Sequence, residues 1–252
     1  MDKLFPEMFE KPDSQAIGAG LAYIVAGFLI LPFFLTIFGL ALFPTEYSQS
    51  WLEVAFHGLS FFICIRAFQD HLTECWNNLR GKKTSFVLTT ALGILACCVL
   101  WIGYALFTPY DGMGLFAMFY SLPIVEKNLV IYPLTILAEI PIPGLLCASV
   151  LTPVAVSCLY YGTAFAPACY TKPWLGYVLV TLLIALPRLL GCLIFRWDNA
   201  MELYTLAAQM PMHWVCCYCY ERTDNIWSPI LIHGVTNLLG SGIVIIFLIL
   251  LG

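Results

Sequence analysis

Long apolar runs separated by short polar segments make up most of this chain. A helix that crosses the hydrocarbon core of a bilayer needs roughly 20 apolar residues. Seven runs approach or exceed that length: Ile17–Phe43, Trp51–Phe68, Thr84–Phe107, Ile142–Cys169, Trp174–Phe195, Met201–Tyr220 and Ile226–Leu251. Only 10% of the residues are charged, whereas a soluble domain carries about 25%. The sequence therefore predicts one integral membrane domain over residues 1–252, an all-α bundle of about seven or eight transmembrane helices.

The number of spans depends on one further apolar stretch, Met113–Pro141. Its interruptions are Pro123, Glu126, Lys127, Pro133 and Pro141. Because proline bends or breaks a helix, we expect a kinked, interfacial or partly inserted helix here. An eighth span is the alternative, and it would invert the orientation of everything that follows.

Basic residues in short loops indicate the orientation, because such loops stay in the cytoplasm. The strongest basic cluster is Arg80, Lys82 and Lys83, directly after the second run. We therefore expect this loop and the N-terminus to be cytoplasmic, with the chain in the plasma membrane of a bacterium.

Charge and cysteine content exclude several classes of partner. The net charge is -4, without a basic stripe for nucleic acid. Most of the 11 cysteines lie inside apolar runs, where a free cysteine acts as a small apolar residue. His213, Cys216 and Cys217 share one helix face, but three ligands from a single helix rarely close a tetrahedral metal site. The expected partners are the lipid bilayer and a peptide or membrane protein, and no cofactor or metal is expected.

The last run contains the most informative pattern. His233 and Asn237 are four residues apart, so they share one helix face. A charged turn, Tyr220-Glu221-Arg222-Thr223, and then Pro229 precede them. Polar side chains inside a bilayer helix are costly and mark functional sites. His233 and Asn237 are therefore the first candidates for site residues.

This pattern resembles the third motif of the CPBP family, the CAAX proteases and bacteriocin-processing proteins, which are multi-span intramembrane proteases. The family has a Glu-Glu-x-x-x-Arg motif, then Phe-x-x-x-His, then His-x-x-x-Asn. The resemblance implies a CPBP-like core over about residues 142–252, after N-terminal spans in about residues 1–110. It also implies that the glutamates activate a water, while the histidines and Asn support the site and the developing oxyanion.

The first two motifs do not carry the family's chemistry. The frame of the first motif fits Pro153 through Gly162, but Val156 and Ser157 stand at the glutamate positions and Tyr161 at the arginine position. No histidine occurs between His71 and His213, and no Asp or Glu between Glu139 and Asp198. The chain resembles peptidases without their catalytic Glu pair, which leaves its status as an enzyme open.

The leading hypothesis is a pseudoprotease that binds a peptide, lipid or membrane partner without cutting it. The first alternative is an active intramembrane endopeptidase with a relocated base. Glu139 or Glu202 would then supply the carboxylate, and His213 would replace the histidine of the second motif. The second alternative is a small transporter or lipid-handling protein, for which few buried charges are available.

Overall fold

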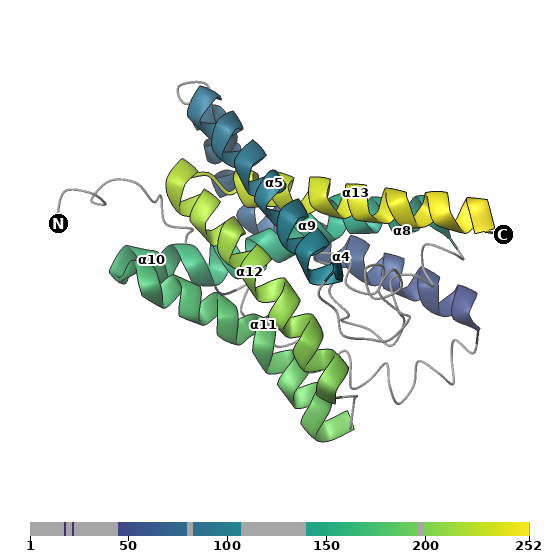
Figure 1. The fold of residues 1–252 in the computed structure, drawn as a ribbon. Coiled ribbons are helices and arrows are strands. Elements are labelled where there is room, and N and C mark those ends of the chain that lie inside the picture. Colours follow the sequence, from purple (N-terminus) through teal and green to yellow (C-terminus); the bar gives the residue numbers. More distant parts are fainter. Residues whose placement is uncertain are drawn as a thin grey trace.

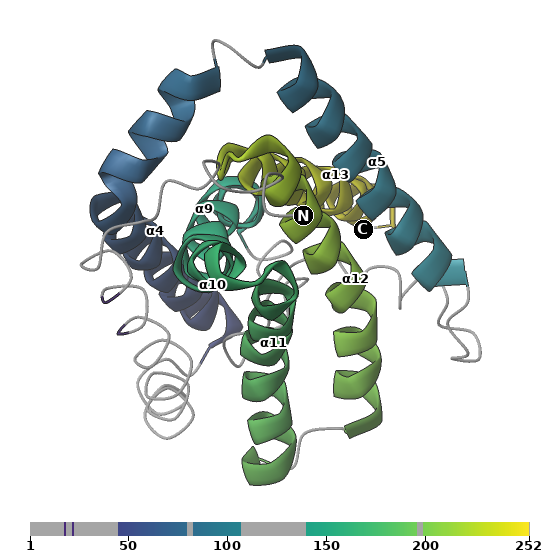
Figure 2. The same ribbon diagram turned by 90° about the vertical axis from the view of Figure 1, so that its left-hand side faces the viewer.

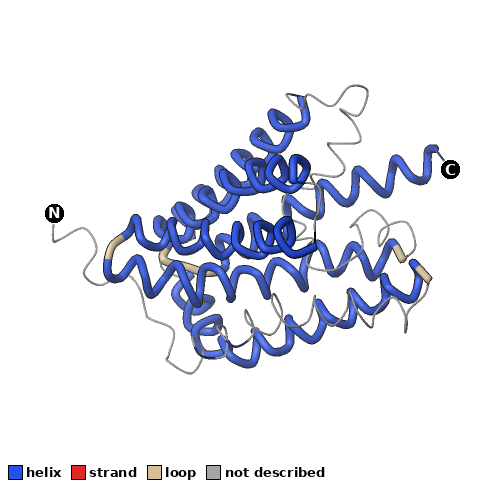
Figure 3. Tube along the Cα trace, turned by 90° about the horizontal axis from the view of Figure 1, so that it is seen from below, coloured by secondary structure: helices blue, strands red, loops and turns tan. Residues whose placement is uncertain are grey.

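The computed structural model describes Gly18, Ala22 and residues 45–79, 83–106, 140–195 and 199–251. In these ranges every regular element is a helix (Figure 3), which confirms the all-α prediction. The α-helices are α4 (Glu46–Asn78), α5 (Lys83–Leu106), α8 (Pro141–Leu146), α9 (Thr152–Val156), α10 (Ala166–Thr171), α11 (Pro173–Phe195), α12 (Asn199–Thr223) and α13 (Trp227–Leu251). Two π-helical segments are η4 (Cys147–Leu151) and η5 (Ser157–Phe165).

Most predicted runs coincide with a helix to within a few residues. By length and composition, three stretches of the described chain can cross a membrane, Ser50–Asn78, Lys83–Gly103 and Pro141–Cys169. Pro173–Leu186 is a shorter apolar helix. The chain is therefore an integral membrane bundle, and the total of seven or eight spans stays a prediction.

The second apolar run ends at Phe68, but α4 continues to Asn78. The added turns are amphipathic: Leu72 and Cys75 are buried while Asp70 is exposed. A helix can leave the apolar layer and continue as long as one face still packs on the protein. Charge alone therefore does not mark the end of α4.

One continuous helix, from α8 to α10, forms the centre of the bundle. Figure 2 shows α9 and α10 between α4 on one side and α12 and α13 on the other. Residues 152–163 are all buried, and so are Phe165 and Ala166. A helix that is apolar and buried on every side is surrounded by other helices, so this segment has no broad lipid-facing stripe.

Both π segments of the central helix begin upstream of a proline and end two residues before it, at Pro153 and Pro167. Proline has no N–H, and its ring clashes with the carbonyl four residues earlier. A wider π turn relieves that clash by moving hydrogen bonds one residue back along the chain. The Thr152 N–H accordingly bonds the Cys147 carbonyl, and the Ala166 N–H bonds the Tyr161 carbonyl.

Contacts between helices give their relative directions. The central helix runs parallel to α4, because His57 meets Thr152 and Cys64 meets Ala155 further along both helices. It runs antiparallel to α13, because the Gly234 backbone lies against Ser149 while Asn237 lies against Ala148.

Helix α5 is antiparallel to α12, since Thr89 meets Cys219 and Cys97 meets Met212. A short turn reverses the chain between α12 and α13, so α5 and α13 share a direction (Figure 1). It follows that α5 ends, and α8 begins, at the same end of the bundle.

The turn before α13 is fastened to the end of α4. Asp224 adopts a positive φ of 51°, a conformation that Asp tolerates better than most residues. The Asn225 amide donates to the Cys75 carbonyl at 2.6 Å, and its oxygen accepts from the Trp227 N–H at 2.9 Å. The Trp227 indole donates to the Leu72 carbonyl at 2.9 Å. These contacts fix where α13, with the His-x-x-x-Asn pattern, enters the bundle.

Candidate functional site

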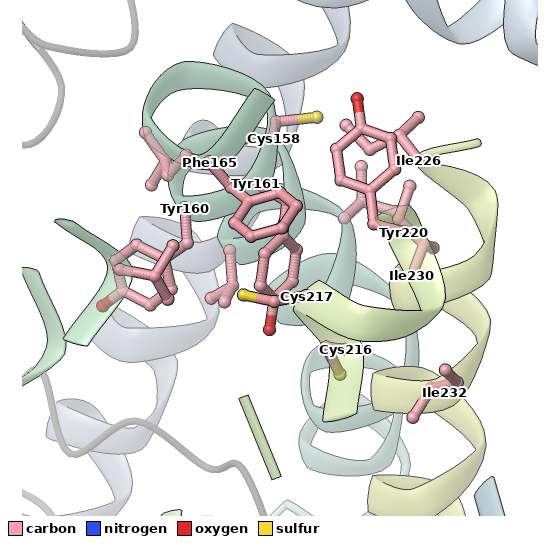
Figure 4. Close-up of a cluster of buried hydrophobic side chains, with 14 of the residues drawn as sticks. Cys158, Tyr160, Tyr161, Phe165, Cys216, Cys217, Tyr220, Ile226, Ile230 and Ile232 are labelled. Carbon is pink, nitrogen blue, oxygen red and sulfur yellow. The ribbon is translucent and has the colours of Figure 1, made fainter. Parts of the chain in front are cut away.

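Four rings from three helices meet in the core and are here named the histidine–tyrosine cluster: Tyr160 and Tyr161 of η5, His213 of α12 and His233 of α13. The ring centroids of His213 and His233 are 6.4 Å apart, and those of Tyr160 and His213 are 5.7 Å apart, both edge to face. All four side chains are at most 2% exposed. Figure 4 shows the two tyrosines among buried side chains that include Cys216 and Cys217.

A hydrogen bond joins the central helix to α12 inside this cluster. The Tyr161 hydroxyl lies 2.9 Å from His213 Nδ1. Tyr161 stands where the resemblance places an arginine, so a neutral phenol replaces a guanidinium. A neutral pair suits a site without water, because a charged side chain in a dry interior requires a counter-charge. Tyr161 therefore joins the central helix to α12 through His213.

The two positions expected to carry glutamates face the core. Val156 is 3% exposed and Ser157 is fully buried. Val156 provides only apolar surface. The Ser157 hydroxyl oxygen has no hydrogen-bond partner, even though it is completely enclosed. This level of the central helix thus supplies a hydroxyl and no carboxylate.

Gly234, next to His233, allows α13 to approach the central helix closely. A Cβ at this position would lie 2.6 Å from the Ser149 carbonyl oxygen and 3.9 Å from the Pro153 side chain. The first distance is too short for any side chain. Glycine is therefore required for this packing, which brings His233 to the central helix.

Asn237 is held by the backbone of η4. Its Nδ2 donates to the Ala148 carbonyl oxygen at 2.9 Å. Pro153, five residues after Ala148, lacks the N–H that a π turn would direct to this carbonyl. The amide of Asn237 replaces that missing donor. Because a carbonyl oxygen only accepts, the nitrogen faces Ala148 and Oδ1 points elsewhere, without a partner.

The predicted site residues divide into three groups. His233, His213 and Tyr161 come together, and Val156 and Ser157 lie within about one turn of Tyr161 on the same helix. Glu202 lies eleven residues before His213 on α12, about 16 Å along the helix axis. Glu139 lies outside the described residues.

Sequence reasoning misses two features of this site. The sequence singles out Tyr161 only because the resemblance puts an arginine at this position. In the structure its hydroxyl lies within hydrogen-bond distance of His213. The bond between Asn237 and Ala148 is also missed, although Pro153 in a buried helix signals a carbonyl that needs another donor. In the part of the chain that the structure describes, no three His, Cys, Asp or Glu side chains are arranged to hold a metal ion.

The groups gathered here are imidazoles, phenols, a hydroxyl and an amide. Imidazole can act as a general acid or base, but residues 140–195, described throughout, contain no carboxylate to activate a water beside it. The donor of Asn237 that contacts Ala148 is already used. The cluster therefore combines groups that can transfer a proton with a central helix that has no carboxylate.

Comparison with known proteins supports the resemblance seen in the sequence. Residues 138–239 match the family model described as "Type II CAAX prenyl endopeptidase Rce1-like". No curated protein and no solved structure matches the chain. The matched range contains the whole central helix, α11, α12 and the part of α13 with His233 and Asn237. Residues 138–239 of this integral membrane protein are therefore similar to the type II CAAX prenyl endopeptidases of the Rce1-like group.

Proposed function

We propose that this chain is a pseudoprotease, an Rce1-like membrane protein that binds a peptide, lipid or membrane partner without cleaving it. One observation supports the proposal: Tyr161 of the central helix meets His213, and the buried Val156 and Ser157 occupy the positions to which the sequence resemblance assigns the glutamates. The Tyr161 hydroxyl and His213 Nδ1, which lie 2.9 Å apart, are both buried.

Magnitudes support the loss of activity. A positioned general base contributes roughly 10²–10⁴-fold to a rate, and preorganised oxyanion donors contribute about 10²–10³-fold. Val156 accepts no proton. Asn237 directs its amide at Ala148 and turns an acceptor oxygen away from it. Both contributions are therefore reduced at once.

The alternative, an active endopeptidase with a relocated base, requires a carboxylate at the level of His233. Glu202 lies about 16 Å along α12 from His213, well beyond the reach of a glutamate side chain. If Glu202 were the base, Glu202→Gln would abolish cleavage together with His233→Ala. We expect the wild type itself to show no cleavage, so that Glu202→Gln changes nothing.

The membrane orientation belongs to the same proposal. The end of α4 lies beside the turn between α12 and α13, as the bonds from Asn225 and Trp227 require, and Arg222 is in the last turn of α12 just before it. Arg80, Lys82 and Lys83 follow α4 directly. This basic end is the cytoplasmic one by the positive-inside rule. The N-terminus is expected on the same side, in a bacterial plasma membrane.

A cleavage assay tests the proposal. The purified chain in lipid nanodiscs would be mixed with a fluorogenic prenylated CAAX peptide, and the peptide would be analysed by mass spectrometry. We expect the peptide to remain intact with the wild type. The variants are His233→Ala and, as a lipid-facing control on the same helix, Leu239→Ala. Cleavage by the wild type and Leu239→Ala that is lost in His233→Ala would overturn the proposal.

A further inference from the structure

Two rows of exposed side chains run along the neighbouring helices α11 and α12 (Figure 2). Each row has one member every four residues: Trp174, Val178 and Leu182 on α11, and Trp214, Tyr218 and Arg222 on α12. Intervals of four keep a row on one side of its helix. The aromatic and aliphatic members are 42–60% exposed, and Arg222 is exposed as well. These six residues are here named the α11–α12 face.

Both rows lie on the same side of the helix pair. The two helices are antiparallel, because the Tyr177 hydroxyl near the start of α11 donates to Glu221 near the end of α12 at 2.8 Å. Val178 comes one residue after Tyr177, and Arg222 comes one residue after Glu221, so each is rotated by about 100° from this contact. Seen from one end, antiparallel helices wind in opposite senses. The two rotations therefore lead to the same side.

The upper part of this face lies at the boundary of the apolar layer. The apolar run of α11 begins at Trp174, and that of α12 ends at Tyr220, two residues before Arg222. The bond from Tyr177 to Glu221 brings these two ends together. Tryptophan and tyrosine are enriched at the level of the lipid headgroups, and arginine extends its charged group toward that level. Arg222 therefore meets the headgroup region.

The side chain of Arg222 is held in a defined orientation. Its Nε donates to the Tyr218 hydroxyl at 3.1 Å, and its Cζ lies 5.2 Å from the centroid of the same ring. In the described part of the chain these are its contacts. The carboxylate of the adjacent Glu221 accepts from Tyr177. The two terminal NH2 groups of Arg222, which hold its remaining N–H donors, are therefore available to an anion.

We propose that the α11–α12 face binds an anionic phospholipid, with the lipid phosphate at Arg222 and an acyl chain along Val178 and Leu182. The planar guanidinium matches two phosphate oxygens. Basic pockets between transmembrane helices bind anionic headgroups in this way. A zwitterionic headgroup would bring its own cation beside Arg222, so a headgroup with a net negative charge fits better.

This lipid site is separate from the histidine–tyrosine cluster. Arg222 follows His213 by nine residues on α12, which is a rotation of about 900°, or half a turn beyond two full turns. The two side chains therefore leave α12 on opposite sides. The lipid site does not depend on the proposed function, and it would be present whether or not the chain cleaves a peptide.

Lipid retention tests the proposal. The purified chain would be loaded with equal amounts of phosphatidylglycerol and phosphatidylcholine, and the bound lipids would be counted by native mass spectrometry. We expect the wild type to prefer phosphatidylglycerol. Arg222→Gln should weaken phosphatidylglycerol binding about 5-fold, the factor that corresponds to about 1 kcal/mol for one basic residue, and leave phosphatidylcholine binding unchanged. A wild type without preference, or an unchanged affinity in Arg222→Gln, overturns the proposal.

The matched control is Arg66→Gln on α4, which removes an equal charge from another exposed arginine, one that bonds Gln69 at 3.0 Å. We expect its affinity for phosphatidylglycerol to equal that of the wild type. An equal loss in both variants would show that binding follows net charge alone, and it overturns the assignment to Arg222.

A density map of the wild type in nanodiscs that contain phosphatidylglycerol supplies a measurement that needs no variant. Headgroup density within hydrogen-bond distance of the Arg222 guanidinium, continuous with an acyl chain along Val178 and Leu182, supports the proposal. An α11–α12 face without bound lipid in that map overturns it.

Discussion

The central helix is bound to α13 and to α12 in different ways. Its contact with α13 is made through the backbone, because Asn237 donates to the Ala148 carbonyl that Pro153 leaves without a donor. Its contact with α12 is made through side chains, because Tyr161 bonds His213. The first contact joins one side chain to a main-chain carbonyl, and the second joins two side chains. A substitution at Ala148 therefore leaves the acceptor of the first contact in place, whereas the second contact needs both of its side chains.

The largest expected effect is at the backbone contact. Asn237→Leu leaves the Ala148 carbonyl buried without a donor, so the free energy of unfolding should fall by about 2–3 kcal/mol. Thermal unfolding in detergent measures it. Pro153→Ala restores an N–H that can bond this carbonyl. In a double-mutant cycle, Asn237→Leu should therefore cost at least about 1 kcal/mol less when Pro153→Ala is present. Additive effects would show that Asn237 does not replace the missing N–H.

A slightly smaller effect is expected for Gly234→Ala. The added methyl group would meet the Ser149 carbonyl oxygen at 2.6 Å, so the helices must move apart, at a cost of about 1–3 kcal/mol. At Gly242 on the same helix, an added methyl group would meet no atom within 4 Å. Gly242→Ala should therefore be neutral or stabilising by up to about 1 kcal/mol. An equal loss of unfolding free energy in Gly234→Ala and Gly242→Ala would contradict this prediction. It would show that the effect comes from replacing any glycine of α13 and not from the close packing at Gly234.

The smallest effect is expected at the side-chain contact. Tyr161→Phe removes one hydroxyl from His213, which should lower the free energy of unfolding by about 1 kcal/mol. Tyr218 is 49% exposed and contacts Arg222 at the surface, so Tyr218→Phe should cost less than about 0.5 kcal/mol. Chemical or thermal unfolding of both variants decides the comparison. A loss at Tyr161 larger than that of Asn237→Leu would reverse the order of the two contacts.

The sequence predicts the parts of the fold that depend on the length of the apolar runs. The helical class and the helices α5, α11, α12 and α13 follow from run length alone. The end of α4 does not, because its last turns depend on packing against Asn225 and Trp227, which are about 150 residues away in the chain. Periodicity within α4 does not contain that information.

The candidate site is predictable in part. The spacing of His233 and Asn237 places both on one face, and the structure brings His213 to His233. The partners of these residues are not predictable, because Tyr161 and Ala148 reach them only through π turns of the central helix. Pro153 and Pro167 are visible in the sequence, but a proline indicates a disturbed helix and not the direction in which nearby side chains then point.

The enclosure of the central helix also has a consequence for how the chain is made. Its buried polar groups, Ser157 among them, are covered by helices that include α12 and α13. Those helices follow in the chain, and 86 residues separate Phe165 from Leu251. At 5–20 residues per second, the ribosome needs roughly 4–17 s to deliver them. During that interval the central helix has no permanent neighbours on that side, so the insertion machinery or an earlier helix must shelter it until α13 arrives.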